Sequence, residues 1–77
     1  MSKKSRELEL IRKIAAYLEL PIDVDDYRRE KYEETERHYI AYASRSFAFE
    51  DCSENKQNER LDELEEILSR FKDIYGN

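Results

Sequence analysis

The sequence predicts an all-α fold, a small antiparallel bundle of three helices that runs up, down and up. Apolar residues recur at three- and four-residue steps in three separate segments, which is the spacing of amphipathic helices. No run alternates apolar and polar residues as a β-strand does, and the sequence has no internal repeat. One glycine and one proline in 77 residues leave few positions that interrupt a helix.

The first helix is expected over residues 5–20. Ser5 is the expected N-cap, because a serine hydroxyl can accept a hydrogen bond from an N–H group of the first turn. Residues 1–4 are expected to be frayed. Pro21 ends the helix, since a proline disfavours the helical conformation at the residue before it. The apolar stripe of this segment follows Leu8, Ile11, Ala15 and Leu18, and Leu10, Ile14 and Tyr17 widen it.

The second helix is expected over residues 24–50, with Asp23 as its N-cap. Residues 44–46 read Ser-Arg-Ser, a stretch of low helix propensity. The sequence therefore leaves open whether the helix bends or continues there. Its three- and four-residue spacing is carried by Tyr32, Thr35, Tyr39, Tyr42, Ser46 and Phe49.

The third helix is expected over residues 55–75, after a polar joint at residues 51–57. Gly76 stands where a C-terminal cap belongs, because glycine adopts the positive φ that such caps use. The pattern leaves three candidates for the N-cap: Asp51, Ser53 and Asn55. The apolar stripe of this helix consists of Leu61, Leu64, Leu68, Phe71 and Tyr75.

The length allows a single domain over residues 1–77. A chain of this size buries only about 60–65% of the surface that it exposes when unfolded, so its stability margin is expected to be thin. Dimerisation would be one way to complete the bundle and to raise that margin.

Charge and composition narrow the classes of partner. The net charge of −5 disfavours nucleic-acid backbones and anionic membranes, and it suits another protein with a basic surface. The longest apolar run, residues 14–18, is too short to cross a bilayer. Cys52 is the only cysteine, so no internal disulfide can form. We expect a cytoplasmic protein, in the host-cell cytoplasm if it is viral.

The sequence offers little for catalysis or for metal binding. His38 is the only histidine, and no nucleophile stands at a suitable spacing from it. Glu34 and His38 would supply only two metal ligands. Asp23, Asp25 and Glu34 have the spacing of a calcium loop, but Arg28 stands where the sharp turn needs glycine. We therefore expect no catalytic residue, no cofactor and no metal ion, and we do not expect an enzyme.

Two surfaces are candidates for partner binding. Tyr42 and Phe49 lie seven residues apart on one flank of the second helix, with His38 and Arg45 close by. A three-helix bundle has limited room for so wide an apolar arc, although the first helix would cover it in the alternative arrangement. Tyrosine and arginine on a rigid element are also favoured at protein interfaces.

The second candidate surface is acidic. Residues 50–66 contain eight acidic residues and two basic ones. Such clustering can steer a basic partner, although an ordinary solvated helix face has the same composition. The residues of this surface that we expect to contact a partner are Glu59, Asp62, Glu63 and Glu66.

These features favour a non-catalytic protein-binding module, a small acidic inhibitor or modulator of a larger protein such as a nuclease, a polymerase or a toxin. Immunity proteins, antitoxins and phage anti-host proteins are of this general type, and the sequence carries no motif of a particular family. A homo-oligomeric structural or assembly protein is the first alternative. A nucleic-acid-binding regulator is the second, and acidic residues along the second helix disfavour it.

Overall fold

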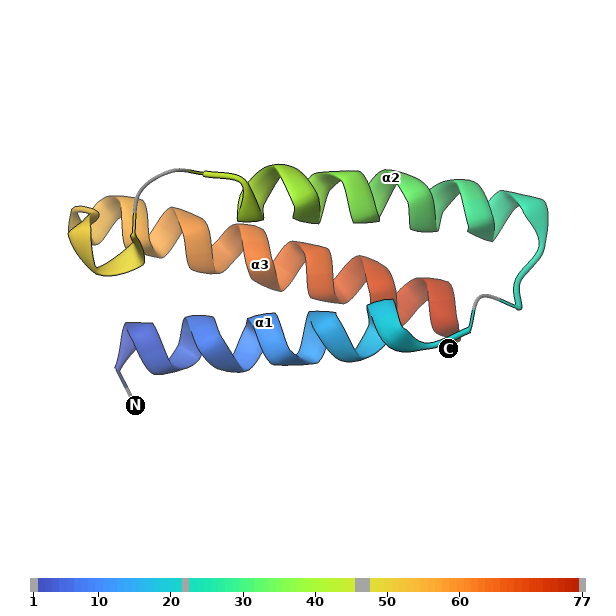
Figure 1. Cartoon of the computed structure of the whole chain (residues 1–77), viewed down its shortest axis with the longest axis horizontal. Helices are drawn as coiled ribbons and strands as arrows, with labels where there is room; N and C mark the ends of the chain where they lie inside the picture. The colour runs from blue at the N-terminus through green and yellow to red at the C-terminus, as the bar shows by residue number, and fades with distance from the viewer. Residues whose placement is uncertain (1, 22, 46–47, 77) are drawn as a thin grey trace.

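The computed structural model describes residues 2–21, 23–45 and 48–76, and it confirms the all-α bundle (Figure 1). Within these residues the chain forms three α-helices, one short 3-10 helix and no strand. The helices are α1 (Lys3–Glu19), α2 (Asp26–Ala43), the 3-10 turn η1 (Phe49–Asp51) and α3 (Glu54–Tyr75).

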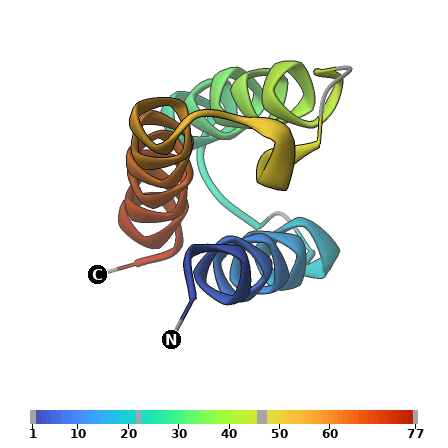
Figure 2. The same ribbon diagram turned by 90° about the vertical axis from the view of Figure 1, so that its left-hand side faces the viewer.

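The α-helices run up, down and up, with α3 packed against both of the others. The extensive contacts between helices are those of α3 with α1 and of α3 with α2. The end-on view shows α1 and α2 on two sides of α3, with η1 crossing between them at one end of the bundle (Figure 2). The helix with the most regular apolar stripe in the sequence thus forms the centre of the fold.

The core is built on α3. Tyr32 of α2 meets Phe71 edge to face, with ring centroids 5.6 Å apart, and Tyr17 of α1 stacks on Phe71 at 6.0 Å. Such aromatic pairs add to the stabilisation that comes from burying their area. The buried residues around them are Leu10, Ile14, Tyr42, Leu64, Ile67, Leu68 and Ile74.

The first two helices begin at other residues than the sequence predicts. Ser2, not Ser5, caps α1 by accepting a hydrogen bond from the Ser5 N–H, so Lys3 and Lys4 are helical rather than frayed. Asp25, not Asp23, caps α2 by accepting from the Arg28 N–H at 2.8 Å. The extra residues before Asp25 are needed to carry the chain from α1 to α2. In both helices the N-cap residue carries a side-chain oxygen, as N-cap preferences predict. The packing of the helices determines which residue takes that position.

The last helix has the expected ends. Ser53, one of the three candidate N-caps, accepts a hydrogen bond from the Lys56 N–H. Gly76 has a φ of +134°, and its N–H donates to the Lys72 carbonyl, which closes the C-terminal end.

The predicted length of the second helix is wrong, since α2 ends at Ala43 and not near residue 50. The Ser44 hydroxyl donates to the Ile40 carbonyl at 2.8 Å, a local bond of the kind that makes serine a poor helix former. Residues 46–47 lie outside the described part of the chain. The next described helix is η1, in which the Phe49 side chain is buried in the core.

Candidate functional site

The aromatic flank predicted for partner binding is not a surface. Tyr42 is 2% exposed and Phe49 is 3% exposed, so the prediction that they form an exposed flank is wrong. Because α2 breaks after Ala43, η1 folds back and brings Phe49 under cover, while α1 covers Tyr42. For Tyr42, the structure has the alternative arrangement, in which the first helix covers the aromatic arc.

Tyr42 belongs to a buried polar cluster that joins the three α-helices. Its hydroxyl donates to Glu7 Oε2 of α1 at 2.9 Å, and Arg60 Nη2 of α3 lies 3.8 Å from the same oxygen. The Arg60 guanidinium also covers the Tyr42 ring, 4.7 Å from its centroid. Burial, together with the hydrogen bond to Glu7, raises the pKa of Tyr42 to about 12. The phenol is therefore neutral near pH 7, which suits a structural group and not a proton-transfer group.

Glu7 and Arg60 are not among the residues predicted from the sequence, because charged side chains are seldom buried. Their positions carry a signal, since Glu7 lies three residues before the buried Leu10 and Arg60 lies four residues before the buried Leu64. Both thus continue the apolar stripe of their own helix.

His38, Arg45 and Glu63 form a second ionic cluster, which ties α2 to α3. The Glu63 carboxylate lies 3.2 Å from His38 Nε2 and 2.9 Å from Arg45 Nη1. Glu63 is largely buried by these contacts, while His38 and Arg45 are partly exposed. Three predicted partner-binding residues therefore come together, but they satisfy one another.

Other acidic residues of the 50–66 segment form ion pairs with cations of α1 at exposed positions. Lys3 pairs with Glu54 at 3.0 Å, and Arg6 pairs with Glu65 at 2.7 Å. Lys4 pairs with Glu50 of η1 at 3.0 Å, and this hydrogen bond holds the pKa of the Glu50 carboxyl below its ordinary value. Much of the negative charge counted in the sequence is thus offset by cations of α1.

What remains is a line of acidic side chains on α3, called here the acidic stripe. Its members lie on one line of the helix, on the side that faces neither α1 nor α2: Glu59, Asp62, Glu66 and Asp73. The four residues are exposed. Glu59 and Glu66 form ion pairs with Lys56 and Arg70 on the same helix, which contribute little at the surface. No ion pair joins Asp62 or Asp73 to another described residue. Of the predicted acidic residues, the structure leaves Glu59, Asp62 and Glu66 open to a partner.

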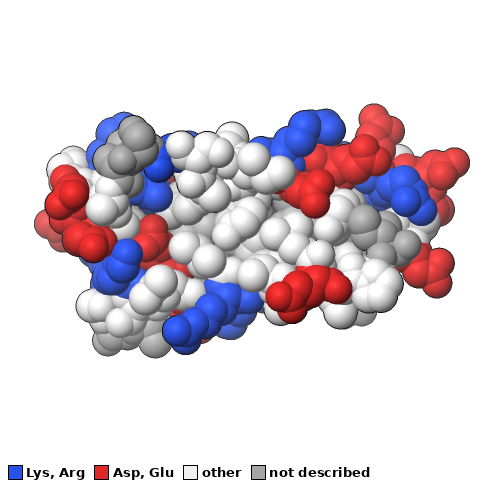
Figure 3. Space-filling model, in the orientation of Figure 1, with Lys and Arg blue, Asp and Glu red and all other residues white. Residues whose placement is uncertain are grey.

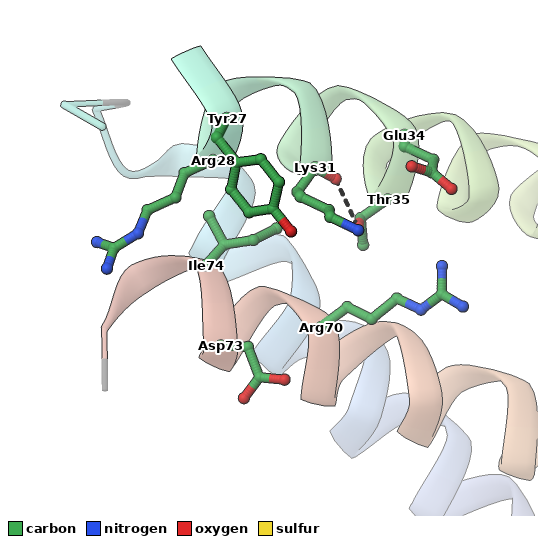
Figure 4. A pocket seen from close by; sticks show the side chains of 8 residues that line it. All are labelled: Tyr27, Arg28, Lys31, Glu34, Thr35, Arg70, Asp73 and Ile74. Atoms are coloured by element: carbon green, nitrogen blue, oxygen red, sulfur yellow. Dashed lines mark hydrogen bonds between the residues drawn. The ribbon is translucent and has the colours of Figure 1, made fainter. Parts of the chain in front are cut away.

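A hollow of about 470 Å³ lies beside the acidic stripe, between α2 and α3 (Figure 4). Tyr27 extends from α2 over Ile74, Lys31 of α2 ends beside Thr35, Arg70 extends from α3, and Asp73 points away. The Thr35 hydroxyl of its lining already donates to the Lys31 carbonyl at 2.8 Å. The hollow is lined by eight residues: Tyr27, Arg28, Lys31, Glu34, Thr35, Arg70, Asp73 and Ile74.

Among the described residues, no group of three or more His, Cys, Asp and Glu side chains is placed to hold a metal ion. None of the described helices is long and apolar enough to cross a membrane.

No protein-family model, curated protein or solved structure matches this chain. Its function must therefore be argued from its own surfaces.

Proposed function

We propose that this chain is a non-catalytic protein-binding module that modulates a larger protein by covering a basic part of its surface with the acidic stripe. The observation that carries the proposal is the division of the acidic residues into two sets. Glu50, Glu54, Glu63 and Glu65 are used within the fold, whereas the stripe points outward.

The stripe suits binding because it is rigid and already ordered. It lies on a 22-residue helix packed on two sides, so little conformational entropy is lost when a partner docks. Asp62 and Asp73 give up no described ion pair in the process. Aligned negative charge also steers a positively charged partner and speeds its association.

Nucleases, polymerases and nucleic-acid-directed toxins have basic surfaces because they bind phosphate backbones. A small acidic module that covers such a surface would act as an inhibitor of the immunity, antitoxin or phage anti-host type, in the cytoplasm where the partner works. Direct nucleic-acid binding has less support, because Lys3, Lys4 and Arg6 are engaged with acidic side chains of the same chain.

The test compares two variants with the same change in net charge. Asp62→Lys with Glu66→Lys reverses the two central charges of the stripe, and Glu30→Lys with Asp51→Lys changes exposed residues elsewhere. Each protein is used to capture partners from a lysate of the source cells, and the association rate of the captured partner is measured against ionic strength. We expect the stripe variant to associate about tenfold or more slowly, and the wild-type rate to fall steeply with salt. Equal rates for both variants, without salt dependence, would remove the stripe from the function.

A homo-oligomeric protein is the second candidate function. The uncharged surface between α1 and α2 favours it, and that surface lies on another side of the molecule from the acidic stripe.

A further inference from the structure

The sides of α1 and α2 that face away from α3 form one broad surface, called here the α1–α2 face. The middle of this face is uncharged, and charged side chains lie along its edges (Figure 3). Leu8 of α1 is 41% exposed and Ile40 of α2 is 54% exposed, each on the outward side of its helix. Ile11 and Tyr39 are half-buried behind them. These four side chains give the middle of the face an apolar character, and apolar residues grouped on a surface often mark an interaction site.

Core contacts fix how α1 and α2 are aligned. Glu7 lies level with Tyr42, since the two are hydrogen-bonded. Tyr17 lies level with Tyr32, since both rings contact Phe71. The two helices run in opposite directions, so residue numbers that increase along α1 lie opposite residue numbers that decrease along α2.

This alignment gives the α1–α2 face a regular pattern of charge. Leu8 lies level with Ile40. One turn further along, Arg12 lies level with Glu36, and two turns beyond that Glu19 lies level with Arg29. Each of these three levels carries either two apolar residues or two opposite charges, one on each helix.

Four charged residues belong to this pattern, two on each helix. Among the described residues, none forms an ion pair with Arg12, Glu19, Arg29 or Glu36. By contrast, Lys3, Lys4, Arg6 and Lys13 of α1 all form ion pairs. The four charges of the pattern lie on the helices that border the α1–α2 face.

We propose that the α1–α2 face binds a second copy of this chain, through a two-fold axis parallel to the helices. Such an axis lays α1 of one protomer along α2 of the other and keeps each level of the pattern in register. Leu8 then meets the partner subunit's Ile40, Arg12 meets the partner subunit's Glu36, and Glu19 meets the partner subunit's Arg29. Every contact occurs twice.

The face is large enough for this interaction. It spans the two longer dimensions of the molecule, 40 and 23 Å. A stable interface buries about 800 Å² on each partner, which is of the same order as the outline of this face. The total surface of the protomer is 5334 Å², so such an interface would take up a modest part of it. The acidic stripe stays accessible in the dimer, which would present it twice.

The experiment measures molar mass by light scattering after size exclusion, from about micromolar to about millimolar protein. We expect a mass near twice 9.4 kDa at high concentration and a fall towards 9.4 kDa on dilution. Ile40→Arg should raise the dissociation constant about a hundredfold, because the change occurs twice in the interface. Tyr27→Arg is the matched control, since Tyr27 is 69% exposed on the same helix but borders the α2–α3 hollow.

An exchange of charges between positions 36 and 12 tests the proposed alignment of the two protomers. Glu36→Arg should weaken the dimer by placing two arginines together, and adding Arg12→Glu should restore it. Circular dichroism confirms that each variant keeps its helices. A monomer at every concentration would overturn the dimer and leave the acidic stripe untouched. A dimer that resists Ile40→Arg, that Tyr27→Arg disrupts equally, or that the second exchange fails to restore would overturn this interface.

Discussion

The Tyr42 hydroxyl donates a hydrogen bond of 2.9 Å to Glu7 Oε2, and both side chains are buried where α2 faces α1. The bond matters because the extensive packing of these helices is with α3 and not with each other. Arg60 of α3 approaches the same carboxylate, so one buried acid is shared by all three α-helices. This cluster fixes the positions of α1 and α2 that the proposed dimer requires.

Tyr42→Phe should lower the free energy of unfolding by about 1–3 kcal/mol, because it removes a hydrogen bond to the buried, charged Glu7 carboxylate, which keeps only Lys4 and Arg60 nearby. Urea denaturation followed by circular dichroism measures the change. Tyr27→Phe removes a hydroxyl from an exposed side chain, and it should stay within about 0.5 kcal/mol of the wild type. Similar losses in both variants would show that the Tyr42–Glu7 bond does not stabilise the fold.

The same hydroxyl predicts a loss of stability in alkali. The pKa of Tyr42 is raised to about 12 by burial and by the bond to Glu7, while an unfolded tyrosine ionises near pH 10. The unfolded chain therefore releases this proton first, and the free energy of unfolding falls as the pH rises from about 10 to about 12. Denaturation across this range measures the slope. Tyr42→Phe should have a shallower slope than the wild type, and parallel slopes would contradict the assignment.

Local periodicity predicted much of the fold, because the positions that face a core recur every three or four residues. The stripe of α3, from Leu64 to Ile74, is buried as that spacing requires. The same spacing led to a predicted second helix that is too long. Phe49 fits the three- and four-residue pattern both as part of α2 and as part of a separate turn. The choice depends on contact with Arg60, which is remote in sequence.

Charge could be counted from the sequence, but its pairing could not be predicted. Glu63 and Asp62 are adjacent acids of one helix, yet Glu63 turns towards Arg45 and Asp62 turns away. Glu65 is neutralised by Arg6, 59 residues earlier in the chain. Such pairings depend on how α1 and α2 are placed around α3, which composition does not determine.

The buried side of α3 should be far more sensitive to small changes than the α1–α2 face of a dissociated protomer. Ile67→Val removes one methyl group from a fully buried site and should cost about 0.5–1.5 kcal/mol. Ile40→Val makes the same change at an exposed site and should cost less than about 0.5 kcal/mol. Urea denaturation at low protein concentration compares them without a contribution from self-association. A larger loss at Ile40 would place that residue inside the monomer.

The N-cap of α3 should contribute measurably to stability, because α3 is the helix on which the other two pack. Ser53→Ala removes the oxygen that accepts from the Lys56 N–H, and it should lower the free energy of unfolding by about 1 kcal/mol. Ser69→Ala is the control, an identical change at an exposed position inside the same helix, where alanine has the higher propensity. It should leave the stability unchanged or slightly raised. Thermal unfolding followed by circular dichroism distinguishes them, and equal midpoints would mean that α3 is held by packing alone.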